Sequence, residues 1–153
     1  MKRLSVFFIL FFIGCASSQI PIYLQDKKPY SRRFFVAYDQ ALAGTKESLE
    51  DLGWKIQDQV APSVYEQDRG TDLYEKEILL LTEIRETHMV VGTRYARLNI
   101  FIRSRDRVSE IEIRYLTVSS LPGKDFKSYQ NDSTVDRIFE RIEKALDTTS
   151  SSS

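Results

Sequence analysis

The chain has 153 residues, with 22 basic and 22 acidic side chains, so its formal net charge is zero. This length allows one domain with a single hydrophobic core. A chain without basic excess lacks the electrostatic footprint of a nucleic-acid-binding protein. With one cysteine, it also has no intramolecular disulfide framework. We therefore expect one folded domain and no nucleic-acid partner.

The first 14 residues have the pattern of a secretory signal peptide. Lys2 and Arg3 form a short positive region, and residues 4–13 are apolar except for Ser5. A run of about ten apolar residues is too short for a helix that crosses a bilayer, which needs roughly 20 residues. It matches the hydrophobic region of a secretory signal. We therefore expect residues 1–14 to be removed on export.

The end of this signal, Phe12-Ile13-Gly14-Cys15, resembles the lipobox of bacterial lipoproteins, which usually has Leu where Phe12 stands. The resemblance implies that Cys15 is acylated and becomes the first residue of the mature protein. Acyl chains at Cys15 would hold the protein on a membrane. Because Ala16 stands where retained lipoproteins commonly have Asp, we expect the outer membrane, with the domain facing the periplasm. An uncleaved anchor and a cut after Ala16 are the alternatives.

A polar, proline-containing stretch over residues 15–30 is expected to be the lipidated tether. The folded domain is expected over residues 31–147, and a disordered serine-rich tail over residues 148–153. Within residues 33–52, apolar side chains recur at spacings that predict a helix, with Gly53 as its C-terminal cap. That stripe consists of Phe35, Tyr38, Leu42, Thr45, Leu49 and Leu52.

Strand patterns follow the first helix. A short extended segment begins at Trp54, and alternation predicts longer strands over residues 77–85, 94–104 and 107–119. We expect turns at Gly92, at residues 105–106 and at residues 121–124. Ser133 is expected to cap a final helix. Its apolar stripe consists of Val135, Ile138, Phe139, Ile142, Ala145 and Leu146.

This order of elements indicates an α+β domain with an antiparallel sheet of about four strands. Each helix has one apolar stripe, so we expect the N- and C-terminal helices to pack on one face of the sheet. The other face is expected to be solvated, with opposite charges paired across strands. Its charged residues are Glu83, Arg85, Arg97, Arg103, Glu110, Glu112 and Arg114.

Few side chains indicate chemistry. His88 is the only histidine, and the sequence has no nucleophile motif and no glycine-rich phosphate loop. We therefore expect no catalytic residue, no metal and no cofactor, with His88 exposed beside a turn. The acidic residues Glu66, Asp68, Asp72 and Glu75 offer a calcium site or an acid–base pair as an alternative, although a solvated turn is the simpler interpretation.

The best candidate for a partner-binding surface is the charged face of the sheet. Arginine and aromatic residues are enriched in protein interfaces. The candidate residues are Tyr95, Arg97, Phe101, Arg103 and Arg114. An exposed face with balanced charges and no partner is the alternative.

Residues 38–57 resemble the helix that opens small domains of several envelope lipoproteins and ends in a Leu-Gly-Trp turn. Together with the later strands and final helix, residues 33–146 are similar in pattern to the helix-grip domains of BamC-type lipoproteins. Those proteins are accessory subunits of the machinery that inserts β-barrels into the outer membrane. The resemblance implies a non-catalytic adaptor that binds an envelope protein. The alternatives are a lipid- or lipopolysaccharide-handling lipoprotein with a cavity under its helices, and a small hydrolase using carboxylates of residues 66–72.

Overall fold

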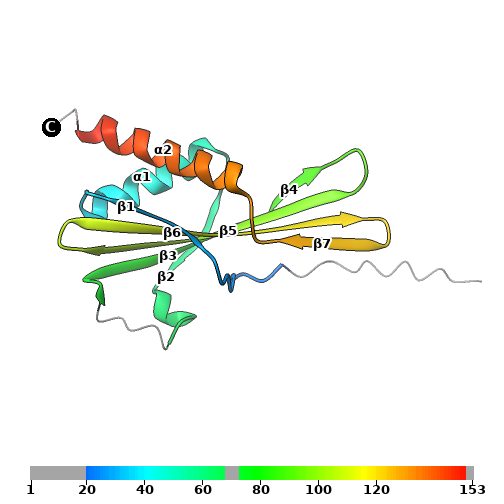
Figure 1. Ribbon diagram of the computed structural model, residues 1–153, viewed down its shortest axis with the longest axis horizontal. Helices are drawn as coiled ribbons and strands as arrows, with labels where there is room; N and C mark the ends of the chain where they lie inside the picture. The colour runs from blue at the N-terminus through cyan, green and yellow to red at the C-terminus, as the bar shows by residue number, and fades with distance from the viewer. Residues whose placement is uncertain (1–19, 68–72, 151–153) are drawn as a thin grey trace, which may run out of the picture.

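The computed structural model describes residues 20–67 and 73–150. Over these residues seven strands form one antiparallel sheet, in the order β1-β6-β5-β3-β2, with β4 beside β5 and β7 beside β6 (Figure 1). The elements are β1 (Tyr30–Phe34), α1 (Tyr38–Asp51), β2 (Ile56–Val60), the 3-10 helix η1 (Pro62–Val64), β3 (Lys76–Thr82), β4 (Arg85–His88), β5 (Thr93–Arg105), β6 (Val108–Leu121), β7 (Lys124–Ser128) and α2 (Asp132–Ser150). The predicted α+β class with an antiparallel sheet is confirmed, although the sheet has more strands than the four expected.

Several predicted features lie outside the described residues. They are the signal peptide, Cys15 with residues 16–19, the acidic loop residues Asp68 and Asp72, and the end of the serine-rich tail at 151–153.

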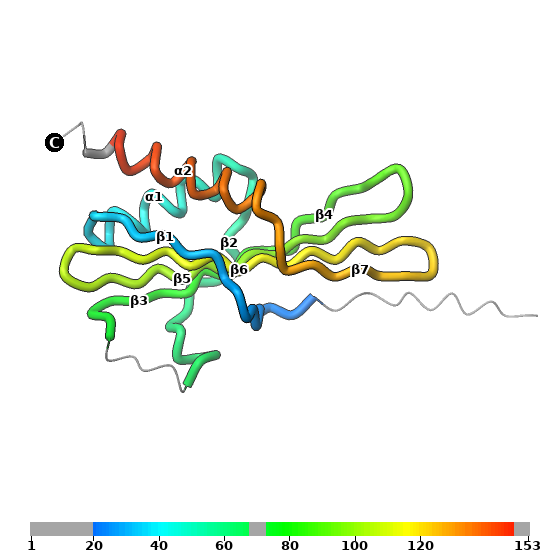
Figure 2. Tube along the Cα trace, in the orientation of Figure 1, coloured from blue at the N-terminus to red at the C-terminus, as the bar shows by residue number. Residues whose placement is uncertain are grey.

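The two long strands β5 and β6 divide the sheet into two parts. Their paired ends at Arg105 and Val108 lie beside β1 and β3, and β2 completes this part, which we call the base. Their other ends, around Thr93 and Leu121, lie between β4 and β7, and these four strands form the wing. The wing projects beyond the helices, so no helix covers it (Figures 1 and 2).

Both helices lie over one face of the base, as predicted (Figure 1). This face of β5 and β6 contributes Leu98, Ile100, Ile111 and Ile113 to the main hydrophobic core. The predicted stripe of α2 is buried against it along its whole length, from Val135 to Leu146. Burial of such side chains contributes roughly 1.5–3 kcal/mol each, which is the main source of helix stability here.

The helix boundaries differ from the prediction in three places. The first helix begins at Tyr38 because residues 30–34 pair with β6 as β1, and Phe35 is 88 % exposed rather than part of the apolar stripe. Asn131, not Ser133, caps α2: its side-chain oxygen accepts a hydrogen bond from the Thr134 N–H at 3.1 Å. The second helix also continues to Ser150, beyond its predicted end at residue 147.

Turn geometry explains the remaining differences in the sheet. The β5–β6 turn lies at Asp106 and Arg107, one residue later than predicted, and both have positive φ, as a tight hairpin turn requires. The predicted break at 121–124 is a second hairpin turn, in which Gly123 has φ 82°, and it leads into the unexpected strand β7. These hairpins account for the extra length of β6.

Candidate functional site

Most of the charged face of the base is covered, contrary to the prediction, although Glu83 and Arg85 are exposed as predicted. Arg97, Arg103 and Arg114 are only 6 %, 3 % and 4 % exposed. Residues 20–24 and the segment around η1 lie across this face (Figure 1). Four of the five residues predicted to form a binding surface are therefore buried within the chain, including Phe101 at 0 % exposure, and Tyr95 is half-buried.

The segment expected to act as a tether is part of this cover over residues 20–24. The Leu24 N–H donates to the Asn99 side-chain oxygen at 2.5 Å, and the Asn99 amide nitrogen donates to the Ile22 carbonyl at 3.0 Å. Ile20 and Leu24 pack into one apolar cluster with Leu116 and Val118 of β6. The Asn99 side chain thus makes the hydrogen bonds with Ile22 and Leu24 that the backbone of a neighbouring strand would otherwise make. The buried polar groups of Asn99 and of the segment are therefore hydrogen-bonded.

An ion-pair network lies under this cover. Arg114 Nη2 lies 2.7 Å from Glu66 Oε1 and 2.8 Å from Glu112 Oε1. The other oxygen of Glu112 accepts a hydrogen bond from Arg103 Nη1 at 2.9 Å. Tyr23 joins the network because Arg114 Nη1 donates to its hydroxyl oxygen at 2.6 Å, and the hydroxyl donates to Glu66 at 2.5 Å. The network therefore links the N-terminal segment, the η1 segment and the two central strands.

Aromatic rings complete the packing of the buried arginines. The guanidinium carbons of Arg114 and Arg103 lie 4.3 Å and 4.5 Å from the centroid of the Phe101 ring, a cation–π geometry. Tyr23 stacks on Tyr65 with ring centroids 4.7 Å apart and planes 2° from parallel. These contacts let two guanidinium groups remain charged in an environment from which water is largely removed.

The pKa values fit a structural role for this network. Burial lowers the pKa of Arg114, but its hydrogen bond to Glu66, the charge of Glu112 and the hydrogen bond with Tyr23 outweigh burial and raise it overall. Burial and hydrogen bonding to Glu66 raise the pKa of Tyr23. At neutral pH Arg114 is thus fully charged and Tyr23 protonated. Neither group offers the near-neutral pKa that acid–base catalysis favours.

Arg97 is held differently from the other two arginines. Its Nη2 donates to Gln57 Oε1 at 3.2 Å, and its Nε has no hydrogen-bond partner among the described residues. Burial lowers the pKa of Arg97. Burial of the Arg97 charge therefore destabilises the fold by its desolvation cost, and no ion pair of Arg97 offsets this cost among the described residues.

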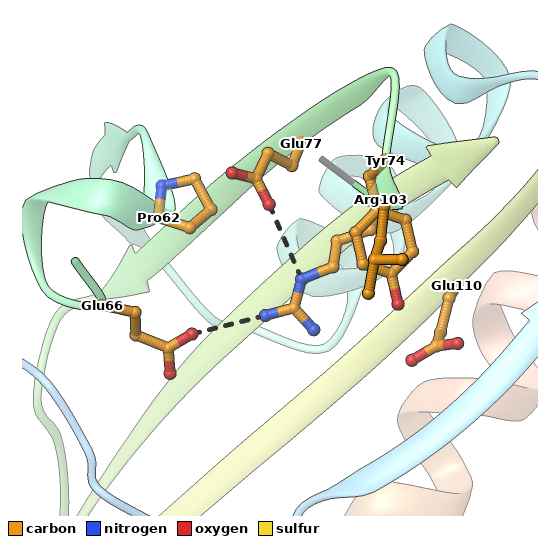
Figure 3. Close-up of a pocket in the computed structure, with 7 residues that line it drawn as sticks. Pro62, Glu66, Tyr74, Glu77, Arg103 and Glu110 are labelled. Atoms are coloured by element: carbon orange, nitrogen blue, oxygen red, sulfur yellow. Dashed lines mark ion pairs between the residues drawn. The ribbon is translucent and has the colours of Figure 1, made fainter. Parts of the chain in front are cut away.

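A small cavity opens beside Arg103 at the end of the base, where β5 turns into β6. Its volume is about 150 Å³. Arg103 points between two acidic side chains, with its Nη2 3.6 Å from Glu66 Oε2 and its Nε 3.8 Å from Glu77 Oε2 (Figure 3). Arg103 Nη2 has no hydrogen-bond partner within the described part of the chain. A shallower depression of about 390 Å³ adjoins it and shares Leu73, Tyr74 and Glu110 as lining residues.

We call these joined depressions the hairpin groove. Its outer part is lined by Arg33, Leu73, Tyr74, Arg105, Asp106, Val108 and Glu110. Leu73 is 61 % exposed, and Arg33 and Arg105 also reach solvent. Sequence patterns did not indicate this groove, because its residues come from loops and from the four strands β1, β3, β5 and β6, which meet only in the folded chain.

Comparison with known proteins gives no family assignment, since no protein-family model and no curated protein sequence matches this chain. Over residues 20–67 and 73–150, no helix is long and apolar enough to cross a membrane. The same residues contain no group of three or more histidine, cysteine or acidic side chains placed to hold a metal ion. His88, at the end of β4, is exposed, with Nε2 3.8 Å from Glu86.

Proposed function

We propose that this protein is a non-catalytic lipoprotein of the bacterial cell envelope that acts as an adaptor for another envelope protein. The observation that carries the proposal is the sequence around Cys15, where the only cysteine of the chain directly follows a signal-like apolar run. Acyl chains on Cys15 would anchor the domain to the outer membrane, on its periplasmic side. The protein would then work by holding a partner at that membrane.

The hairpin groove is the surface we propose for this partner. It combines the Tyr74 ring, the exposed Leu73 side chain and arginines; aromatic residues and arginine are enriched at protein interfaces. The charged groups of the buried face, by contrast, are engaged in holding residues 20–24 and the η1 segment in place. An adaptor is favoured over a hydrolase because Glu66 is committed to Arg114 and Tyr23 rather than open to a substrate.

The resemblance to BamC-type lipoproteins remains a proposal. Two helices over one face of an antiparallel sheet support a helix-grip arrangement. The wing strands β4 and β7 go beyond the four-strand version predicted from the sequence. The space between helices and sheet is filled by buried side chains such as Leu98, Ile100 and Phe139, which gives no support to lipid carriage there.

Intact mass spectrometry of the membrane-extracted protein tests the anchor. We expect the loss of residues 1–14 and the added mass of acyl chains, both absent from Cys15→Ala. An unmodified Cys15 in the wild-type protein would contradict the lipoprotein assignment.

Site-specific photocrosslinking in cells tests the groove. A crosslinking residue at Leu73 should capture one discrete envelope protein, whereas the same residue at Glu140, on the exposed side of α2, should not. Equal capture at both positions, or none at Leu73, would argue against the hairpin groove as the partner site.

A further inference from the structure

The wing ends in two uncharged hairpin turns, and the first of them lies against the end of β6 that leads into the second. The β4–β5 turn is Met89-Val90-Val91-Gly92, closed by a 3.1 Å hydrogen bond from the Met89 N–H to the Gly92 carbonyl. The β6–β7 turn is Pro122-Gly123, next to Leu121. Gly92 contacts Ser120 so closely that a Cβ at this position would overlap the Ser120 carbonyl oxygen. The two turns therefore lie at the same end of the sheet, and we call them together the wing tip.

The wing tip exposes large apolar side chains to solvent. Val90 is fully exposed and Val91 is 57 % exposed. Charged residues of both signs stand behind the turns on the strands, among them Glu86, Arg94, Lys124 and Asp125. Adjacent apolar side chains at a projecting tip, with charges set back from them, are suited to the boundary between lipid head groups and acyl chains.

The path of the N-terminal segment places the membrane at this end of the molecule. Leu24 and Ile22 form hydrogen bonds with Asn99, whereas Ile20 packs beside Val118, which lies nearer the wing on β6. From Leu24 to Ile20 the segment therefore runs along the sheet toward the wing. Figures 1 and 2 show the segment reaching the sheet from the wing side. Ile20, the described residue nearest to Cys15 in the sequence, therefore lies on the wing side of Leu24.

The length of chain between anchor and domain is short. Four residues separate Cys15 from Ile20, so five extended residues span at most about 18 Å between them. Leu121 lies three residues beyond Val118 on β6, about 10 Å further along the strand. A bilayer that holds Cys15 is therefore within reach of the wing tip.

We infer that the wing tip is a second membrane contact, in which Val90, Val91 and Pro122 enter the interfacial region of the bilayer that holds Cys15. This inference rests on the proposed acylation of Cys15. The two contacts would set the long axis of the sheet upright on the membrane. Because β5 has 13 residues, its far end, with the hairpin groove, would stand about 40 Å from the lipid surface.

A fluorescent label on the full-length lipoprotein tests this contact. An acylated Cys15 is a thioether and does not react, so Val90→Cys supplies the single reactive thiol, and intact mass reports both acylation and the number of labels. The matched control is Asp106→Cys, in the hairpin turn at the opposite end of the same two strands. Each protein is measured in native membranes and, after extraction, in phosphatidylethanolamine–phosphatidylglycerol vesicles with and without brominated acyl chains.

We expect the label at position 90 to shift to shorter wavelength and to be quenched by brominated lipid, whereas the label at position 106 does neither. Pro122→Cys should behave like position 90. Adding Val91→Asp should reverse the shift at position 122, because a carboxylate enters the interfacial region unfavourably.

Three results would overturn the inference. One is an acylated, singly labelled protein in which position 90 stays as water-exposed as position 106. Another is a shift at position 90 in native membranes but not in vesicles, which would identify a protein rather than lipid as the occupant. The third is a second label on Cys15, which would show a free thiol; that result would contradict the proposed function itself and remove the reason for placing lipid at the wing tip.

Discussion

The base and the wing of the sheet share two continuous strands but have opposite environments. In the base, residues 96–104 of β5 are all buried, because helices cover one face and the N-terminal and η1 segments cover the other. In the wing, every residue of β4 and of β7 is exposed. The same strands therefore provide a rigid, doubly covered body at one end and an uncovered surface at the other. The contact proposed with lipid lies at the end that the chain has not covered, and the groove proposed for a protein partner lies at the opposite end of the same two strands.

The largest effect should come from breaking the buried ion network of the base. Arg114→Ala leaves Glu112 and Glu66 without their shortest ion pairs, and removing one member of a buried pair costs about 3–5 kcal/mol. We expect a loss of that size in the free energy of unfolding, measured by urea denaturation. The control is Arg33→Ala, which breaks the exposed pair with Glu110 and should cost less than about 1 kcal/mol. Equal losses for both variants would show that the network adds no stability of its own.

The next effect concerns the cover over the base. Leu24 is fully buried, so Leu24→Ala should lower the free energy of unfolding by about 2–4 kcal/mol. It should also make residues 20–29 sensitive to limited proteolysis. Ile22→Ala, a neighbouring position that is 36 % exposed, should change both measurements little. If the two variants behave alike, residues 20–24 are a tether rather than part of the fold.

The sequence predicted the helix-covered side of the base well. The stripe of α2 and the alternation in β5 and β6 were read correctly, because apolar periodicity reports directly on one continuous core. It also predicted the turn at Gly92, where φ is 86°.

The prediction for the opposite side of the base was wrong because alternating polar residues on a strand fit two environments, a solvated face and a buried network of ion pairs. Arg103, Glu112 and Arg114 give the same pattern on a solvated face as in a buried network. The difference depends on whether another segment covers them. That segment, around Leu24, is short and contains prolines, so it has no periodicity to detect. The hairpin groove was missed for the same reason, since Tyr74 and Arg105 meet only through the β3–β5 pairing and the turn beyond it.

In the wing, alanine substitutions at Gly92 and at Gly123 distinguish the cost of a strained backbone from the cost of a close contact with β6. Gly92→Ala places a methyl group at positive φ and against the Ser120 carbonyl, whereas Gly123→Ala has a similar φ with nothing within 4 Å. Positive φ costs an alanine about 1–2 kcal/mol, and overpacking adds about 1 kcal/mol or more. We therefore expect Gly92→Ala to cost at least about 2 kcal/mol and Gly123→Ala about 1–2 kcal/mol.

Because the wing is uncovered, this loss should be local rather than global. Hydrogen exchange of the β4 and β7 amides should accelerate more in Gly92→Ala than in Gly123→Ala, with the base amides unchanged. Accelerated exchange throughout the base as well would show that the two parts of the sheet open as one unit.

The smallest effect we expect is the pH dependence due to Tyr23 in the base. Burial and the hydrogen bond to Glu66 raise the pKa of Tyr23 above its ordinary value of 10.0. The folded protein therefore holds this proton more tightly than the unfolded chain does. By linkage, the stabilisation is complete below pH 10 and is lost as the pH rises through the folded-state pKa.

Tyr23→Phe removes this hydroxyl and leaves the ring stacked on Tyr65. We expect a loss of about 1–2 kcal/mol at pH 8, because the hydrogen bonds that the hydroxyl donates to Glu66 and accepts from Arg114 both disappear while Arg114 still pairs with Glu66. Above pH 10, the variant's stability should fall less steeply than that of the wild type. The exposed Tyr129, changed to Phe, is the matched control and should leave the steepness unchanged. If stability above pH 10 falls as steeply in Tyr23→Phe as in the wild type, the alkaline loss of stability comes from other tyrosines. Candidates are Tyr30 and Tyr38, whose pKa values burial also raises.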